Sequence, residues 1–257
     1  MAIEMTIGIL LVGMIGGYLG GLVGIIGATI VPGLILLGVD PVTAISSSLL
    51  LHVLISPIGG LSHYKLGHVH RKIVVPLILG GGLGAFFGAN ISSRLPGPEL
   101  KIIIGVITIA AGLLSITRYS RKNSIKSKLT NANGDLSKSV LVSIVSIAVI
   151  AGLTSGALGL GWGALAIPVL MLIGISPHDA VGSSLLTRAF VALVGVSTFY
   201  LVGGLRAEVI LPLLVGGIIA IPLGALTTKR LQPKTMKKIV GMVIILLGIS
   251  ILVKLVI

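Results

Sequence analysis

The chain has 257 residues, of which 55% are hydrophobic and only 10% are charged. A soluble domain of this length needs a largely polar exterior, so the composition excludes that class and indicates an integral membrane protein. Cysteine is absent, which excludes disulfides, thiolate catalysis and cysteine-ligated metals. The formal net charge is +13; we attribute it to basic cytoplasmic loops and exclude nucleic acid as a partner.

The first part of the chain contains four apolar segments that are predicted to be helices, at 6–37, 42–66, 73–93 and 100–117. Several apolar runs in the chain exceed the roughly 20 residues that a helix needs to cross a bilayer. No basic region precedes the first run and no small-residue cleavage site ends it, so we interpret it as a retained membrane segment. Residues 1–117 are predicted to form a first membrane repeat.

A polar, basic and turn-rich stretch follows at 118–138 and is predicted to be a cytoplasmic linker. Four more apolar segments come after it, at 141–173, 178–202, 209–228 and 236–256. Residues 139–257 are therefore predicted to form a second membrane repeat.

The two halves match each other at an offset of 136 residues, which indicates an internal repeat. The matches include prolines, glycines and a run of four residues: Pro32 with Pro168, Gly38 with Gly174, Pro41 with Pro177, Ser47-Ser48-Leu49-Leu50 with Ser183-Ser184-Leu185-Leu186, Pro76 with Pro212, and Arg94 with Arg230. The predicted fold is all-α and integral to the membrane, with two homologous repeats of about four segments each.

The first segment of each repeat is too long for one ordinary span and too short for two. Glycines at 24 and 27, and at 161 and 163, are expected to break it, so that it is one crossing, a re-entrant hairpin or two short crossings. A single crossing makes the repeats parallel and divides the loop Lys and Arg 11 to 7 between the two sides. A hairpin or two short crossings make the repeats inverted and divide them 14 to 4. The second division fits the positive-inside rule better, so we predict inverted repeats with both termini outside.

Other glycines recur at four-residue spacing, at 16, 20 and 24 and at 80, 84 and 88, and are expected to allow close helix packing. Gly27 and Gly163, each followed by a proline five residues later, are instead expected at a binding site. Paired broken helices in two inverted repeats are the sequence feature that best indicates the binding site of a transporter.

Arg188 is the only lysine or arginine well inside an apolar segment, about 15 Å from the start of its helix. A buried arginine at that depth indicates a functional site, although a structural role toward backbone carbonyls remains an alternative. Its repeat counterpart is His52. Hydroxyl side chains surround the two positions, at Ser47, Ser48, Ser183, Ser184 and Thr187. Because no carboxylate occurs at this depth, the predicted substrate is an anion.

Three histidines at 63, 68 and 70 are interpreted as loop residues, with metal binding as the minor alternative. We expect neither a metal nor another cofactor. An enzyme is not expected either, because the sequence around Ser155 lacks the spacing of an intramembrane serine protease.

The order of the duplicated motifs resembles the sulfite exporter TauE/SafE family. These motifs are a G-x-x-G, an apolar stretch to a proline, then Gly38-Val39-Asp40-Pro41 or Gly174-Ile175-Ser176-Pro177, then Ala44 or Ala180 before Ser-Ser-Leu-Leu. The resemblance covers 16–115 and 152–251. It implies a multi-pass permease, and some relatives are linked to export of sulfite, sulfoacetate or other sulfur-containing organic anions.

The sequence thus predicts a transporter of small anions in the cell membrane, working by alternating access at a midplane site. A gated anion channel is the alternative. The predicted partners are a small anion and the lipid bilayer, and a homo-oligomer is left open.

Overall fold

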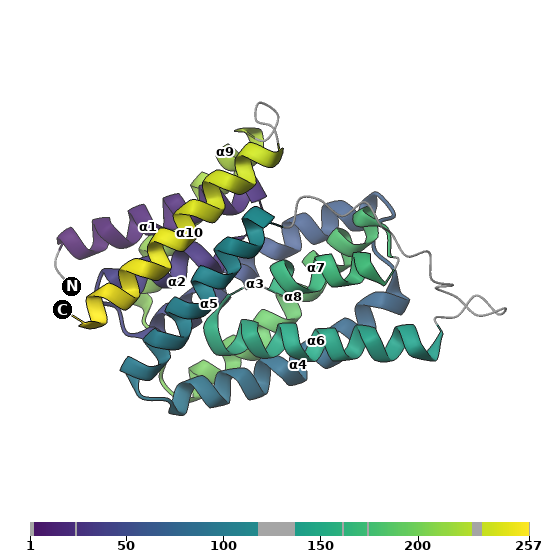
Figure 1. Cartoon of the computed structure of the whole chain (residues 1–257), viewed down its shortest axis with the longest axis horizontal. Coiled ribbons are helices and arrows are strands. Elements are labelled where there is room, and N and C mark those ends of the chain that lie inside the picture. Colours follow the sequence, from purple (N-terminus) through teal and green to yellow (C-terminus); the bar gives the residue numbers. More distant parts are fainter. Residues whose placement is uncertain are drawn as a thin grey trace.

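The computed structural model describes residues 3–23, 25–117, 137–160, 162–173, 175–227 and 233–256, and the regular structure in these ranges is helical (Figure 1). The first half contains α1 (Ile3–Val23), α2 (Gly27–Leu36), α3 (Pro41–Lys65), α4 (Arg71–Arg94) and α5 (Gly97–Thr117). The second half contains α6 (Lys138–Leu158), α7 (Trp162–Leu172), α8 (Pro177–Leu201), α9 (Ala207–Thr227) and α10 (Pro233–Val256). The predicted linker lies outside the described residues, except for its last two positions.

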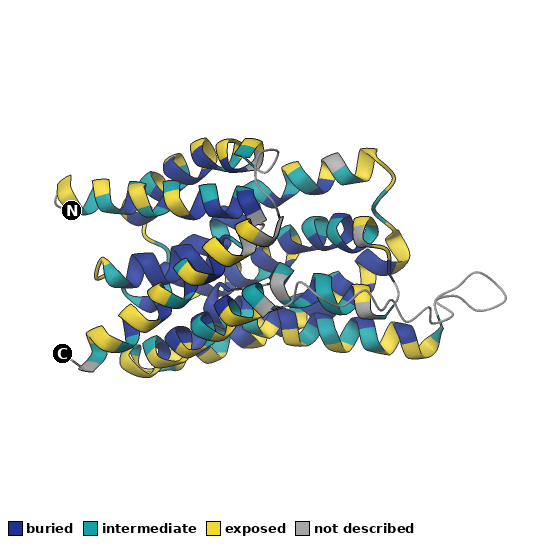
Figure 2. Ribbon diagram, turned by 45° about the horizontal axis from the view of Figure 1, so that its top comes forward, coloured by how far each residue is buried: buried dark blue, intermediate teal, exposed yellow. Residues whose placement is uncertain are grey.

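Eight of the described helices are long and apolar enough to cross a membrane, which confirms the predicted all-α, multi-pass membrane fold. The two short helices, α2 and α7, have 10 and 11 residues. At 1.5 Å per residue each covers about 15 Å, or half of the hydrocarbon core. Large apolar side chains such as Ile58, Leu79 and Leu211 are exposed on the outer faces, and Figure 2 shows the buried residues gathered inside. The exterior therefore suits contact with lipid.

The first predicted segment, 6–37, is a helical hairpin. A Cβ at Gly20 would contact Ile26, one at Gly16 would contact Ile30, and one at Gly8 would lie 3.2 Å from Leu37. Because the contacts on α1 move toward its start as those on α2 move toward its end, α2 runs back along α1. The predicted break is confirmed, since α1 ends at Val23 and α2 begins at Gly27.

The second half has the corresponding arrangement. The helix α6 ends at Leu158, and α7 begins at Trp162 and packs against α6 and α8. The indole Nε1 of Trp162 donates a hydrogen bond of 3.0 Å to the backbone carbonyl of Ser184, which lies well inside α8. Because α7 ends only a few residues before α8 begins, α7 runs from the middle of α8 back to its start.

Close helix pairs join the two halves through glycines. Along α4, Cβ atoms at Gly80, Gly84 and Gly88 would meet the backbone of Val145, Val149 and Leu153 of α6 in that order, so the two helices run in the same direction. This confirms the packing role predicted for these glycines. The helices α1 and α9 pair in the same way, with Gly13 beside Leu213 and Gly224 beside Tyr18.

Two further pairs are antiparallel and have reciprocal contacts. In the α3–α8 pair, Gly59 faces Leu185 and Gly195 faces Leu49. In the α5–α10 pair, Gly105 faces Gly248 and Gly112 faces Gly241. Each contact and its reciprocal are related by the offset of 136 residues found in the sequence.

The helix directions that follow place the start of α1 and the end of α10 at the same end of the helix bundle. In both views these two ends lie at the same end of the molecule (Figures 1 and 2). The end of α5 and the start of α6, which flank the predicted linker, lie on the opposite side.

The buried apolar side chains form two clusters. The larger one includes Ile9 of α1, Leu34 of α2 and Ile244 of α10. The smaller one includes Ile144 of α6 and Leu170 of α7. The helix α8 contributes to both, with Ala180 and Val191 in the smaller cluster and Ala192 and Phe199 in the larger one. The middle of α8 therefore lies where the two clusters meet.

Candidate functional site

Gly27 is the first residue of α2 and lies against the break in the other half of the chain. A Cβ at this position would overlap the carbonyl oxygen of Gly159 and lie 3.3 Å from the hydroxyl oxygen of Ser48. The Ser48 hydroxyl itself donates a long hydrogen bond, 3.4 Å, to the same carbonyl. Since a backbone carbonyl occupies the start of α2, the positive end of this short helix faces a protein dipole.

Gly159 ends α6 in a left-handed conformation, with φ of 65°, and its backbone N–H donates to the carbonyl of Ser155 at 2.8 Å. Left-handed backbone at a helix end favours glycine, because a Cβ would be strained there. The break in this half therefore begins earlier than the glycines at 161 and 163 that the sequence suggested. Gly163 lies in the first turn of α7.

Gly163 lies against the guanidinium group of Arg188. A Cβ at Gly163 would overlap Nη2 of Arg188, so only glycine leaves room for the arginine head at the start of α7. The exposed fraction of Arg188 is 5%. The N-terminus of a helix carries about half a positive charge, and its first N–H groups lack partners within the helix. The guanidinium of Arg188 and the positive N-terminal end of α7 thus lie next to each other inside the protein.

His52 is the counterpart of Arg188, and each is the twelfth residue of its helix in α3 or α8. The exposed fraction of His52 is also 5%. The Gly59–Leu185 and Gly195–Leu49 contacts set the register of the antiparallel α3–α8 pair, and in this register His52 and Arg188 lie about one helical turn apart along the pair. The two side chains therefore lie near the middle of the pair and come from different helices.

No carboxylate in the described residues accompanies this pair. The acidic residues there lie at helix ends or just before a helix: Glu4, Asp40, Glu99, Asp179 and Glu208. Because no acidic residue of the described ranges lies at this depth, the site favours an anionic ligand over a cationic one.

The hydroxyl groups predicted at the site are all buried but do not all face the same place. The hydroxyl of Ser48, in α3, lies beside the start of α2. The carbonyl of Ser184 accepts the hydrogen bond from Trp162. The hydroxyls of Ser47 and Ser184 have no hydrogen-bond partner among the described residues. These two buried hydroxyls are thus able to bond a ligand that reaches them.

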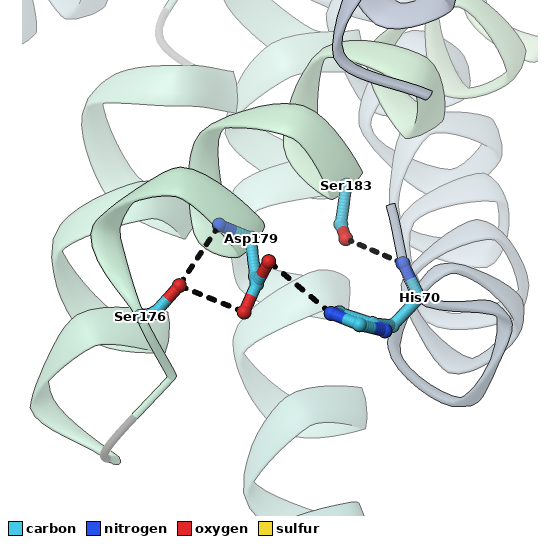
Figure 3. Close-up of polar contacts among 4 residues, drawn as sticks. All are labelled: His70, Ser176, Asp179 and Ser183. Atoms are coloured by element: carbon cyan, nitrogen blue, oxygen red, sulfur yellow. Dashed lines mark hydrogen bonds and ion pairs between the residues drawn. The ribbon is translucent and has the colours of Figure 1, made fainter. Parts of the chain in front are cut away.

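Two other predicted hydroxyls are engaged elsewhere. Thr187 donates to the carbonyl of Ser183 at 2.7 Å, within its own helix. The Ser183 hydroxyl accepts from the backbone N–H of His70 at 3.5 Å. Ser183 therefore faces the α3–α4 loop, toward one end of the α3–α8 pair (Figure 3).

Polar contacts connect a loop to a helix start at both ends of the α3–α8 pair. At one end, Nε2 of His70 lies 3.2 Å from a carboxylate oxygen of Asp179, which also bonds Ser176 (Figure 3). At the other end, Arg206 lies 3.8 Å from Asp40. There the Ser46 hydroxyl also donates to the carbonyl of Gly204 at 2.7 Å. We call these the histidine-end contact and the arginine-end contact.

The other two of these histidines, His63 and His68, lie beside the histidine-end contact. Their rings have centroids 5.6 Å apart, and His68 stacks on His178 of α8 with centroids 5.0 Å apart. His68 and His70 lie in the α3–α4 loop, as the sequence predicts, whereas His63 lies in the last turn of α3 because the helix continues to Lys65.

Sequence reasoning missed Trp162, the only tryptophan of the chain. Its side chain is buried, bonds to α8 and fills the space above Gly81, where a Cβ would lie 2.6 Å from the indole ring. The signal was present: a single large aromatic residue lies between two glycines at the predicted break. We infer that Trp162 holds the start of α7 beside Arg188.

Comparison with known proteins places the chain among membrane transporters. A family model described as "Sulfite exporter TauE/SafE" matches residues 9–251. The chain is 30% identical over 242 residues to the probable membrane transporter protein YtnM of Bacillus subtilis, covering 91% of this chain and 77% of the relative. It is 26% identical over 258 residues to YunE, another probable membrane transporter of that organism, covering 93% and 94%. No solved structure matches.

Proposed function

The chain belongs to the TauE/SafE sulfite exporter family, and from that membership and the site geometry we propose that it transports small anions through a site formed by Arg188 and the start of α7. The relatives are named as membrane transporters, which supports transport in general. The family description names sulfite. We propose sulfur-containing oxyanions or organosulfonates as the substrate class.

One observation carries this proposal: the Arg188 guanidinium lies against the first turn of α7. A cation at the positive end of a helix is unfavourable, whereas an anion between them interacts favourably with both. The guanidinium offers a planar fork of donors that can hold two oxyanion oxygens. The N–H groups of α7 and the hydroxyls of Ser47 and Ser184 would supply further donors.

We further propose that the two halves are inverted repeats and that transport occurs by alternating access. The hairpins α1–α2 and α6–α7, the parallel pairs and the antiparallel pairs support opposite orientations of the halves. The substrate site lies at the break positions, where such transporters place it. The polar contacts at both ends of the α3–α8 pair favour a transporter with two gates over an open channel.

Anion binding by purified protein tests the proposal. Sulfite, sulfate, sulfoacetate, taurine and chloride would be compared at constant ionic strength, with thermal stability and Trp162 fluorescence as the two readouts. We expect at least one sulfur oxyanion to stabilise the wild type. Arg188→Ala should lose this response and Arg188→Lys should keep a weakened one. Arg206→Ala, which removes an arginine from the arginine-end contact, is the control and should keep the response.

The outcomes separate binding from a structural role. If Arg188→Ala protein elutes as a single species and binds the anion with unchanged affinity, the site assignment is wrong. A structural arginine instead predicts misfolded protein for both Ala and Lys, because buried carbonyls would lose their donor. His52 substitution should reduce binding less than Arg188→Ala does, since imidazole does not replace the fixed charge.

Counterflow in liposomes distinguishes a transporter from a channel. In a transporter, unlabelled anion inside should accelerate uptake of labelled anion, because the loaded site returns faster than the empty one. Flux that does not saturate and shows no such acceleration would favour the gated anion channel.

Topology is tested by labelling single cysteines on the natural cysteine-free background. We expect cysteines at Ser124, in the predicted linker, and after Ile257 to react from opposite sides, with the linker in the cytoplasm. Labelling of both from the same side would contradict inverted repeats.

A further inference from the structure

The buried site contains one fixed charge and one titratable group. His52 and Arg188 occupy equivalent positions in the two halves, and each is 5% exposed. The Nδ1 atom of His52 is buried and has no hydrogen-bond partner among the described residues. An imidazole nitrogen in this situation can accept a proton without first giving up a bond.

Arg188 is the charged group that acts on His52. The elements that pack against α3 are α2, α5, α6, α8 and α9. Their described titratable residues, apart from Arg188, lie near helix ends: Glu99 and Lys101 of α5, Lys138 of α6, His178, Asp179 and Tyr200 of α8, and Glu208 of α9. On α3 itself, His63, Tyr64 and Lys65 are at the end.

Burial and the charge of Arg188 together therefore set the energy of a proton on His52. Two cations in a low-dielectric interior repel each other, so an empty site opposes an imidazolium beside the guanidinium. An anion bound to Arg188 cancels this repulsion and adds an attraction. By linkage, a proton on His52 must then strengthen anion binding by the same factor.

We propose that His52 takes up one proton with each anion, so that the protein is a proton-coupled anion symporter. This inference rests on the proposed function. The proton adds to the neutral imidazole on one side of the membrane, crosses with the anion and leaves the imidazole on the other side. Transport of a monovalent anion is then electrically neutral, and a divalent anion moves one net negative charge.

The experiment measures protons and anions in the same proteoliposomes. The probe is labelled sulfoacetate, whose sulfonate and carboxylate both stay ionised between pH 6 and 8. Exchange at equal pH reports anion transport, and a pH dye inside the liposomes reports proton entry. We expect the wild type to exchange sulfoacetate, to accumulate it toward the alkaline side, and to move about one proton per anion.

His52→Gln keeps the size and polarity of the side chain but does not titrate. We expect its proton-to-anion ratio to fall to zero whatever flux remains. His63→Gln is the matched control and should keep the wild-type ratio, because His63 is a second histidine of α3 that lies in its last turn and takes no part in the histidine-end contact. In purified protein, stabilisation by sulfoacetate should increase as the pH falls in the wild type, by up to about tenfold in affinity per pH unit, and should not change with pH in His52→Gln.

Each contrary result has its own meaning. Exchange without proton movement in the wild type overturns the coupling and leaves the proposed function standing. A ratio of one in His52→Gln, or a loss of coupling in His63→Gln, also overturns it, because the proton site is then elsewhere. If the wild type shows no exchange at equal pH, the proposed function fails for this anion and the inference fails with it. If His52→Gln lacks measurable flux, pH-dependent stabilisation of that variant overturns the coupling.

Discussion

The starts of the two short helices occupy equivalent places in the sequence but have different surroundings. At the start of α2, the Gly159 carbonyl lies against Gly27. At the start of α7, the Arg188 guanidinium lies against Gly163. The partial negative charge of a carbonyl oxygen interacts favourably with the positive end of a helix, whereas the positive charge of a guanidinium does not. On our proposal, the start of α7 holds the substrate, and the start of α2 has a structural role.

The C-terminal end of α2 is also bound by a neighbouring helix. The C-terminal carbonyl of Leu36, at the end of α2, accepts a hydrogen bond of 2.9 Å from Nζ of Lys254 of α10. A lysine at this end also interacts favourably with the helix dipole. The helix α2 contacts α5 and α10 in addition to α1 and α3, whereas the main contacts of α7 are with α6 and α8. Both ends of α2 are therefore held by neighbouring elements.

Replacing Gly27 or Gly163 by leucine is expected to have the largest effect on transport, and it tests the comparison of the two short helices directly. Gly163→Leu and Gly27→Leu should both abolish transport. Gly163→Leu should insert and fold, because the arginine head can move aside, but should not bind the anion. Gly27→Leu should in addition lose stability, by about 1–3 kcal/mol or more, because its neighbour is backbone that cannot move cheaply.

Gly97→Leu is the control for these variants, since a Cβ there meets nothing within 4 Å. Thermal unfolding and anion binding would be measured on all three proteins. If Gly27→Leu and Gly163→Leu have equal stability, the distinction between a structural α2 and a binding α7 is wrong. If either variant transports at the wild-type rate, that glycine is not needed for transport.

Trp162→Phe gives the next largest effect. The phenyl ring fills most of the space beside Gly81 but does not donate to the Ser184 carbonyl. We expect the start of α7 to become less well held beside Arg188, which costs about 1 kcal/mol and weakens anion affinity roughly fivefold. Transport kinetics should show a raised KM with a smaller change in maximal rate. A lowered maximal rate at unchanged KM would argue against a positioning role.

Lys254→Gln gives the smallest expected effect. It removes a charge from the end of α2 and leaves an amide in its place. We expect the Tm to fall by at most about 3 °C and anion binding to stay the same, because α2 does not hold the substrate. Lys238→Gln, an exposed change on the same helix, serves as control. A loss of anion binding in Lys254→Gln alone would show that α2 takes part in the site.

Much of the fold followed from the sequence because apolar length and glycine or proline punctuation are local signals. The helices begin and end within about three residues of the predicted segments, apart from the division of the first segment in each half. The depth of Arg188 and His52 followed from counting residues along a helix. The break after α6 was placed too late, because the left-handed residue Gly159 was not distinguished from the neighbouring glycines.

The asymmetry between the two breaks could not be predicted. The repeat offset relates equivalent positions of the two halves, whereas the Gly27–Gly159 contact joins positions that are not equivalent. The pairing of α1 with α9 and of α4 with α6 is of the same kind. Such contacts depend on how two complete modules dock, and no local pattern records that. Trp162 was missed for a related reason, because its partner lies on another helix.

The exchanged pairing of long helices has a consequence for how the protein is made. During synthesis α1 and α4 are made before their partners. Glycines of α1 pack against α9 and glycines of α4 pack against α6, so these contacts form only after the second half is made. When the ribosome reaches the linker, the first half therefore still lacks the helices that pack against α1 and α4. Two halves made as separate chains should assemble only with each other present, and a truncated first half should be degraded as an orphan.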